Sequence, residues 1–160
     1  MSEPQIEYRP KGHYAGIRTR APLTEWGRVN ALLPEVEGWL AERGIAVIGP
    51  PMYRYHTVDE TGVIDVEVGW PVAEPVEGDG RVTAREVPEG DYAVVVHEGH
   101  PDSLRETFDR LDEWSDRTGE YFDVRDGVWA GRFETYLTDP EHEPDLGKWR
   151  TEVAYLLNRG

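Results

Sequence analysis

The second half of this 160-residue chain repeats the first half, imperfectly but in order. The matching blocks are residues 8–15 with 86–93, residues 29–44 with 104–119, and residues 67–72 with 152–157. A duplicated unit of roughly 75 to 80 residues is too long for a solenoid repeat and too short for two comfortable independent domains. We therefore expect one domain with pseudo-twofold symmetry and a ligand cleft at the seam between its unequal halves.

The residues that recur are those that shape turns and helix faces. The first block keeps its Pro, Gly, Tyr and Ala, and the second keeps an apolar stripe closed by Gly. The matched pairs of the second block are Val29 and Leu104, Leu33 and Phe108, Val36 and Leu111, Trp39 and Trp114, and Gly44 and Gly119. This helical spacing predicts one helix in each half, and Pro34 predicts a kink or break in the first.

Each half is expected to form a β-α-β-β unit, which gives an α+β fold with antiparallel sheet. Ser103 and Glu106 have the spacing of a capping box at the start of the second helix. The expected strands are 15–19, 52–58 and 63–70 in the first half, and 92–97, 128–137 and 149–157 in the second. The halves span about 5–72 and 82–158, residues 73–81 form a linker, and 138–148 is a polar loop.

Composition limits the kinds of partner. The chain has 32 acidic and 17 basic residues, a net charge of -15, which disfavours nucleic acid and favours cationic small molecules or basic protein surfaces. The alternative is a solvated acidic shell. Arg outnumbers Lys, as in proteins of a GC-rich genome or a salty cytoplasm. With no cysteine, no leader and no membrane-length apolar run, we expect a cytoplasmic protein.

Several catalytic classes lack their signatures. No glycine-rich phosphate loop, Rossmann fingerprint or nucleophile elbow occurs. His97, His100 and Asp102 fall short of zinc-site spacing, and we interpret them as a turn with solvated histidines, with His142 on a loop surface. We therefore expect neither a metal nor a cofactor.

Carboxylates within the apolar strands are the main candidates for chemistry. Period-2 alternation places Arg132, Glu134 and Tyr136 on one face of their strand. Glu152 and its repeat counterpart Glu67 also lie within strands. Burying a carboxylate costs several kcal/mol unless it is paired, so each acid is either satisfied or functional. The simpler alternative places each one in solvent or beside an arginine.

The chain is also rich in aromatic residues, with six Trp and eight Tyr. The symmetry is expected to bring several to the seam: Trp39, Tyr55, Trp114, Tyr136 and Trp149. Aromatic walls around one acid suit flat cationic or polarised organic molecules. Ordinary core packing is the alternative for each ring.

The repeat, the segment 133–140 and the closing segment 149–155 resemble the GyrI-like family, the small-molecule-binding domain also found as the effector module of multidrug-sensing regulators. The resemblance covers about residues 7–157. It implies an aromatic cleft with a buried glutamate, which matches Glu134, and wall aromatics that match Trp149 and fall near Trp39 and Trp114. Arg54 lies opposite Glu134 in the repeat alignment, so a single functional acid is expected.

The resemblance implies three functions. No helix-turn-helix precedes the domain, so it looks like a stand-alone member that binds a lipophilic or aromatic small molecule. Some stand-alone members resemble hydrolases that open cyclopropane-bearing DNA-alkylating compounds. In that case Glu134 would be the general base, and Tyr136 would tune it. A third possibility is modulation of DNA gyrase, through a protein-contact surface that the sequence does not locate.

Overall fold

One curled antiparallel sheet of eight strands organises the molecule in the computed structural model, which describes residues 3–159. Its strands are β1 (Gln5–Arg9), β2 (Gly12–Pro22), β3 (Met52–Val58), β4 (Val63–Val72), β5 (Thr83–Val87), β6 (Gly90–Glu98), β9 (Arg132–Tyr136) and β10 (Arg150–Leu156). The strands β7 (Val124–Arg125) and β8 (Val128–Trp129) form a separate small hairpin. The helices are α1 (Trp26–Asn30), α2 (Leu32–Glu42) and α3 (Leu104–Thr118), which confirms the α+β class.

The order of strands in the sheet is β1-β6-β10-β9-β3-β4-β2-β5. The strands have counterparts in the other half: β1 and β5, β2 and β6, β3 and β9, β4 and β10. If each strand is replaced by its counterpart, the result is the same list read from its other end. The duplication seen in the sequence is therefore a twofold relation between strands, and its axis passes between β3 and β9. Each half also gives its first strand to the other, since β1 pairs with β6 and β5 pairs with β2.

The strand register corrects one detail of the repeat alignment. Tyr53 pairs with Val68, and Glu134 pairs with Val153, the repeat counterpart of Val68. Tyr53 and Glu134 are also cross-strand partners of each other. The counterpart of Glu134 is therefore Tyr53, and Arg54 projects from the opposite face of the sheet, because successive residues of a strand alternate. The expectation of one acid holds, since Tyr53 is not an acid.

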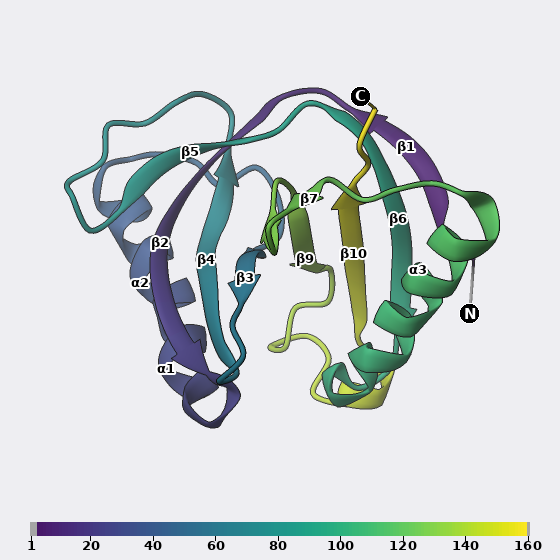
Figure 1. The fold of residues 1–160 in the computed structure, drawn as a ribbon. Helices are drawn as coiled ribbons and strands as arrows, with labels where there is room; N and C mark the ends of the chain where they lie inside the picture. The colour runs from purple at the N-terminus through teal and green to yellow at the C-terminus, as the bar shows by residue number, and fades with distance from the viewer. Residues whose placement is uncertain (1–2, 160) are drawn as a thin grey trace.

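Helices cover one face of the sheet. The sheet curls around its other face, so that side chains of its own strands pack together there. Figure 1 shows α1 and α2 beside the first-half strands and α3 beside the second-half strands. The buried faces of these helices centre on Val36 and Leu40 in one core and on Leu111 and Trp114 in another. A third core, with Tyr14, Tyr92 and Phe133 among its members, fills the opposite face of the curled sheet.

The first helix breaks, as predicted, but ahead of the proline. α1 ends at Asn30, α2 begins at Leu32, and Pro34 lies in the first turn of α2. Proline has no N–H to donate to the carbonyl four residues earlier, which here belongs to Asn30. The break therefore appears at Ala31, and Pro34 is tolerated in a first turn whose N–H groups lack intrahelical acceptors.

Two local predictions were wrong, and two strands were missed. The expected strand 128–137 is divided, because residues 128–129 pair with β7 and only β9 joins the sheet. The expected capping box does not form, because the Ser103 hydroxyl donates to the carbonyl of His100 instead of a helical N–H. The strands β1 and β5 were not predicted. Within residues 3–159, no helix combines the length and apolar character needed to cross a bilayer.

Candidate functional site

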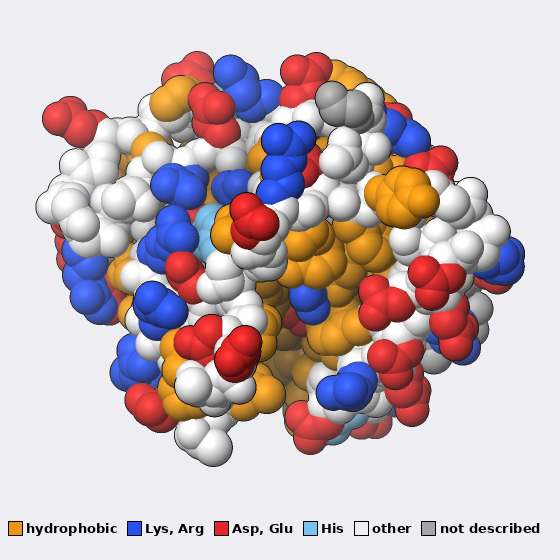
Figure 2. Space-filling model, in the orientation of Figure 1, with side chains coloured by type: hydrophobic (Ala, Val, Ile, Leu, Met, Phe, Trp, Pro, Cys, Tyr) orange, Lys and Arg blue, Asp and Glu red, His pale blue; other side chains and the backbone are white. Residues whose placement is uncertain are grey.

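A cavity of about 820 Å³ lies between the two halves on the helix-bearing side of the sheet. The first half contributes residues of α1, α2 and β3, and the second half contributes the segments 101–102 and 136–141 together with Trp149. Aromatic rings make much of its wall: Trp26, Tyr53, Trp70, Tyr136 and Trp149. Figure 2 shows a hollow between the halves with hydrophobic side chains along its sides.

Four carboxylate side chains also line the cavity: Glu37, Asp102, Asp139 and Glu141. None of its described lining residues is Lys or Arg. The hydrogen bond donated by the backbone N–H of Glu141 is the main cause that lowers the pKa of Asp139. Burial opposes it, and the hydrogen bond with His142 lowers the pKa further. The cavity therefore has a negative field at neutral pH, and a cation entering it would be attracted.

Ring contacts and hydrogen bonds hold the aromatic wall. Trp26 stacks on Tyr53 with centroids 6.4 Å apart, and Tyr53 meets Tyr136 edge to face at 5.2 Å. The indole of Trp70 donates to the carbonyl of Leu33 at 2.9 Å, and that of Trp149 donates to the carbonyl of Glu143 at 2.8 Å. The rings are thus positioned before any ligand arrives, which reduces the entropy lost on binding.

Glu134 lies beside the cavity and does not line it. Its side chain is on the same face as Tyr53 and Tyr136, which do line the cavity, and the residue is 3% exposed. Burial raises the pKa of its carboxyl, although a hydrogen bond with Tyr55 and the charge of Arg132 act to lower it. Its Oε2 atom is buried with no hydrogen-bond partner among the described residues. A buried carboxylate oxygen without a partner is costly and is a feature typical of functional sites.

The tyrosines around Glu134 remain protonated. Burial and the nearby charge of Glu134 raise the pKa of Tyr53, Tyr55 and Tyr136. All three therefore keep their hydroxyl protons near neutral pH and are potential hydrogen-bond donors. The hydroxyl of Tyr53 is already 2.6 Å from the side-chain oxygen of Asn30 on α1, which also lines the cavity.

The structure brings some of the predicted site residues together and separates others. Tyr136 and Trp149 line the cavity, and Tyr55 and Glu134 lie next to it. Trp39 does not line it, because its indole donates to Asp79 at 2.9 Å and its ring is covered by the Arg43 guanidinium at 3.8 Å. Trp114 is 7% exposed in the second-half core.

Trp26, Tyr53 and Trp70 are cavity residues that the sequence reasoning missed. Trp26 lies three residues before Val29, at the spacing of the apolar stripe of the first helix, which is typical of a core position. Strand alternation places Tyr53 on the same face of β3 as Tyr55, which was a predicted site residue, and this was the signal that could have identified Tyr53.

The other strand acids lie on the opposite face of the sheet, beside basic side chains, although the Oε2 atom of Glu67 is also buried without a hydrogen-bond partner among the described residues. Glu67 is 1% exposed, 2.6 Å from His56 and 3.3 Å from Arg85. Burial acts to raise the pKa of its carboxyl, but the hydrogen bond with His56 and the charges of Arg85 and Arg54 hold it below its usual range. Glu152 forms an ion pair with Arg9 at 2.8 Å.

Of the two histidines in segment 97–100, His100 is exposed, as predicted, and His97 is not. His97 is 1% exposed and is not solvated. Its ring nitrogens lie 2.7 Å from the Thr107 hydroxyl and 2.9 Å from the Ser103 hydroxyl, so it fastens the start of α3 to β6. His142 is on the surface, as expected. Within residues 3–159, no group of three or more His, Asp or Glu is arranged to hold a metal ion.

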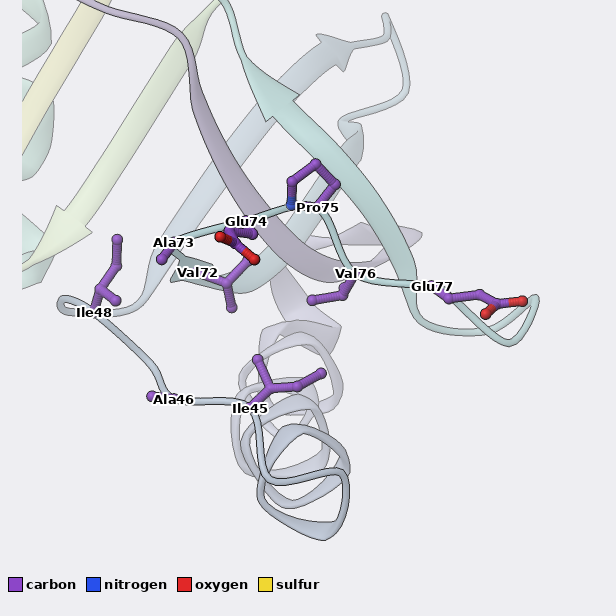
Figure 3. A pocket seen from close by; sticks show the side chains of 9 residues that line it. All are labelled: Ile45, Ala46, Ile48, Val72, Ala73, Glu74, Pro75, Val76 and Glu77. Carbon is purple, nitrogen blue, oxygen red and sulfur yellow. The ribbon is translucent and has the colours of Figure 1, made fainter.

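A second and smaller pocket, of about 330 Å³, lies on the outer side of the first half. Figure 3 shows its lining residues, which come from the segments 45–48 and 72–77. Only the larger cavity is lined from both halves and lies beside a buried carboxylate, so it is the candidate site.

Comparison with known proteins agrees with this geometry. The family model described as the GyrI-like small molecule binding domain matches residues 2–155. No curated protein matches the chain. The C-terminal domain of EcmrR is similar in structure, with a TM-score of 0.83 at 18% identity over 99% of this chain and 98% of that domain. Against the EcmrR chain in its DNA complex, the match covers 58% of that chain at a TM-score of 0.84.

Two further solved structures share the fold. One is described as a hydrolase from Listeria innocua, with a TM-score of 0.66 at 14% identity over 98% of this chain and 92% of that one. The other is SAV2435 bound to tetraphenylphosphonium, with a TM-score of 0.65 at 13% identity over 99% of this chain and 95% of that one.

Proposed function

The chain belongs to the GyrI-like small-molecule-binding family, and on that premise we propose that it binds a lipophilic organic cation in the cavity between its halves. The observation that carries the proposal is the composition of the cavity wall. Five aromatic rings and four carboxylates line it, and no basic side chain does among the described residues. Aromatic faces and carboxylates both attract a delocalised cation that water solvates weakly.

Glu134 provides the deeper anchor of the proposed site. Its unpartnered Oε2 belongs to a side chain on the sheet face that carries Tyr53 and Tyr136, two residues that line the cavity. A cation that displaces water from these rings would lie close enough to repay part of the cost of burying the carboxylate. The tetraphenylphosphonium bound by SAV2435 is a compound of this class and supports the choice of ligand.

The test compares two probes of similar shape, methyltriphenylphosphonium and neutral triphenylphosphine oxide, by quenching of tryptophan fluorescence. The wild-type protein is expected to bind the cation at least about tenfold more tightly, a difference of about 1.4 kcal/mol. Glu134→Gln is expected to remove most of this preference. Glu152→Gln, on the opposite face of the sheet, is the matched control and should preserve it. Equal affinity of the wild type for the two probes would exclude the proposal.

A second candidate function is hydrolysis of a cyclopropane-bearing aromatic compound, favoured by the unpartnered oxygen and raised pKa of Glu134. Glu134 would take a proton from water as the water oxygen bonds to a cyclopropane carbon. The breaking carbon–carbon bond would send its electrons to a conjugated carbonyl, and a tyrosine would stabilise the resulting phenolate. Mass spectrometry of the recovered compound distinguishes the two functions, since hydrolysis adds one water and binding leaves the mass unchanged.

A further inference from the structure

A guanidinium group occupies an aromatic cage beside Glu134. The central carbon of Arg132 lies 4.7 Å from the ring centroid of Trp129, 4.9 Å from that of Tyr155 and 5.1 Å from that of Phe108. The ring of Tyr55, which hydrogen bonds with Glu134, completes the cage at 5.7 Å.

The guanidinium of Arg132 has an N–H donor without an acceptor. Its Nε atom is buried and has no hydrogen-bond partner among the described residues, and no carboxylate of residues 3–159 lies within 4.0 Å of it. Guanidinium presents five N–H donors in a planar fork that fits carboxylate and carbonyl oxygens. Ring contacts stabilise its positive charge, but they leave the buried Nε donor without an acceptor.

Arg132 and Glu134 therefore offer opposite halves of one recognition site. They are two residues apart on β9, so their side chains share a face with backbone positions about 7 Å apart. The two side chains do not pair with each other, and each has a buried polar atom without a partner. One aromatic side chain, Tyr55, contacts both groups.

We propose that Arg132 and Glu134 together select a planar aromatic zwitterion, whose anionic oxygen binds the Arg132 fork while its cationic end faces Glu134. This inference rests on the proposed function and narrows its ligand class. A simple lipophilic cation would pair with Glu134 alone and would leave the buried Nε donor of Arg132 without an acceptor. A zwitterion of matching length would satisfy both buried groups at once, with charge-assisted hydrogen bonds at the arginine.

The test uses a pair of dyes that differ in one group. Rhodamine 110 carries a free carboxylate on a xanthene cation, and rhodamine 123 is its methyl ester. Fluorescence polarisation measures both affinities without a further label. We expect the wild type to prefer rhodamine 110, and Arg132→Met to bring the affinity ratio down about tenfold or more by weakening rhodamine 110 and strengthening rhodamine 123.

Two further variants separate recognition from folding. Arg132→Lys keeps the charge but loses the planar fork, and it should lose part of the preference even if the Met variant does not fold. Arg150→Met removes an exposed charge from the neighbouring strand β10 and should leave the affinity ratio unchanged. Glu134→Gln should weaken both dyes.

The outcomes are distinguishable. An affinity ratio unchanged in both folded Arg132 variants overturns the inference. So does binding of methyltriphenylphosphonium by a wild type that binds neither dye. If the wild type binds neither the dyes nor methyltriphenylphosphonium, the proposed function itself fails.

Discussion

Ionisation of Glu134 links the charge of the cavity to the stability of the fold. Burial raises the pKa of this carboxyl, so the folded state favours its protonated form more than the unfolded state does. The sign follows from linkage: stability decreases as pH rises from the unfolded pKa through the folded one. Above that window, the ionised group opposes folding.

Glu134→Gln is therefore expected to stabilise the protein at pH 7 while it weakens cation binding. The gain in unfolding free energy should be about 1 kcal/mol, typical of replacing a functional group held in an unfavourable environment. Urea unfolding at pH 7 and at pH 4 measures it, and the gain should shrink at the lower pH. A variant less stable than the wild type at pH 7 would show that the carboxylate is fully satisfied in the fold.

The pH dependence of binding has the opposite direction. Methyltriphenylphosphonium does not titrate, so its affinity should increase as pH rises through the pKa of Glu134 and then level off. Affinities measured over a series of pH values should show this slope in the wild type and not in Glu134→Gln. His142 lies 2.9 Å from Asp139 at the cavity wall, so its contribution has to be separated from that of Glu134. His142→Asn serves as its control and should keep the slope.

At the residue scale, alternation along β9 was enough to predict that Arg132, Glu134 and Tyr136 share one face. The same alternation does not say which acids find partners. Glu67 and Glu134 both lie in apolar strands, and each has one buried carboxylate oxygen without a hydrogen-bond partner. The other oxygen of Glu67 lies beside His56 and Arg85, whereas Glu134 is hydrogen bonded by Tyr55. Those contacts come from other strands, so no pattern within a single strand carries them.

At the scale of the element, the hairpin of β3 and β4 was predictable because its apolar alternation is strong. The missed strands β1 and β5 are the two edges of the sheet, and most of their side chains are exposed or only partly buried. Edge strands are commonly short and charged, which reduces their pairing with strands of other molecules. The same features weaken the alternating sequence pattern by which a strand is predicted. Their pairing depends on a neighbouring strand from the other half.

The pairing of β2 with β4 places two glycines opposite each other in the first half. Gly16 pairs with Gly69, and a Cβ on Gly69 would lie 2.3 Å from the carbonyl oxygen of Ala15. Gly69→Ala should therefore destabilise the protein by about 1–3 kcal/mol, because the backbone of β2 has to move. Gly38→Ala on α2 is the matched control, since a Cβ there meets no atom within 4 Å and should add about 0.5–1 kcal/mol of helix stability. Urea midpoints measure both, and an unchanged midpoint for Gly69→Ala would contradict the close approach.

At the scale of the whole molecule, the repeat correctly predicted one domain-wide twofold relation, but it did not reveal the exchange of first strands. Because β1 pairs with β6 and β5 pairs with β2, each half completes the sheet of the other. The axis between β3 and β9 then brings Tyr53 and Glu134 together, one from each half. The two strands at the axis are related by the twofold symmetry, but the paired residues Tyr53 and Glu134 differ, and this difference makes the site asymmetric.

This exchange predicts that the halves do not unfold separately. Either half alone would lack one edge strand and expose the strand edge where β3 meets β9. The first half, with α1 and α2, and the second half, with α3, should therefore lose structure in one transition. Far-ultraviolet circular dichroism reports on all helices and strands. The fluorescence of the Trp114→Phe variant reports on the other five tryptophans, three of which line the cavity.

The urea unfolding curves measured by these two signals are expected to coincide, and a fragment of residues 82–160 should remain unfolded. Two separated transitions, or a folded fragment, would show that the halves are independent units and that the cavity forms only when they dock.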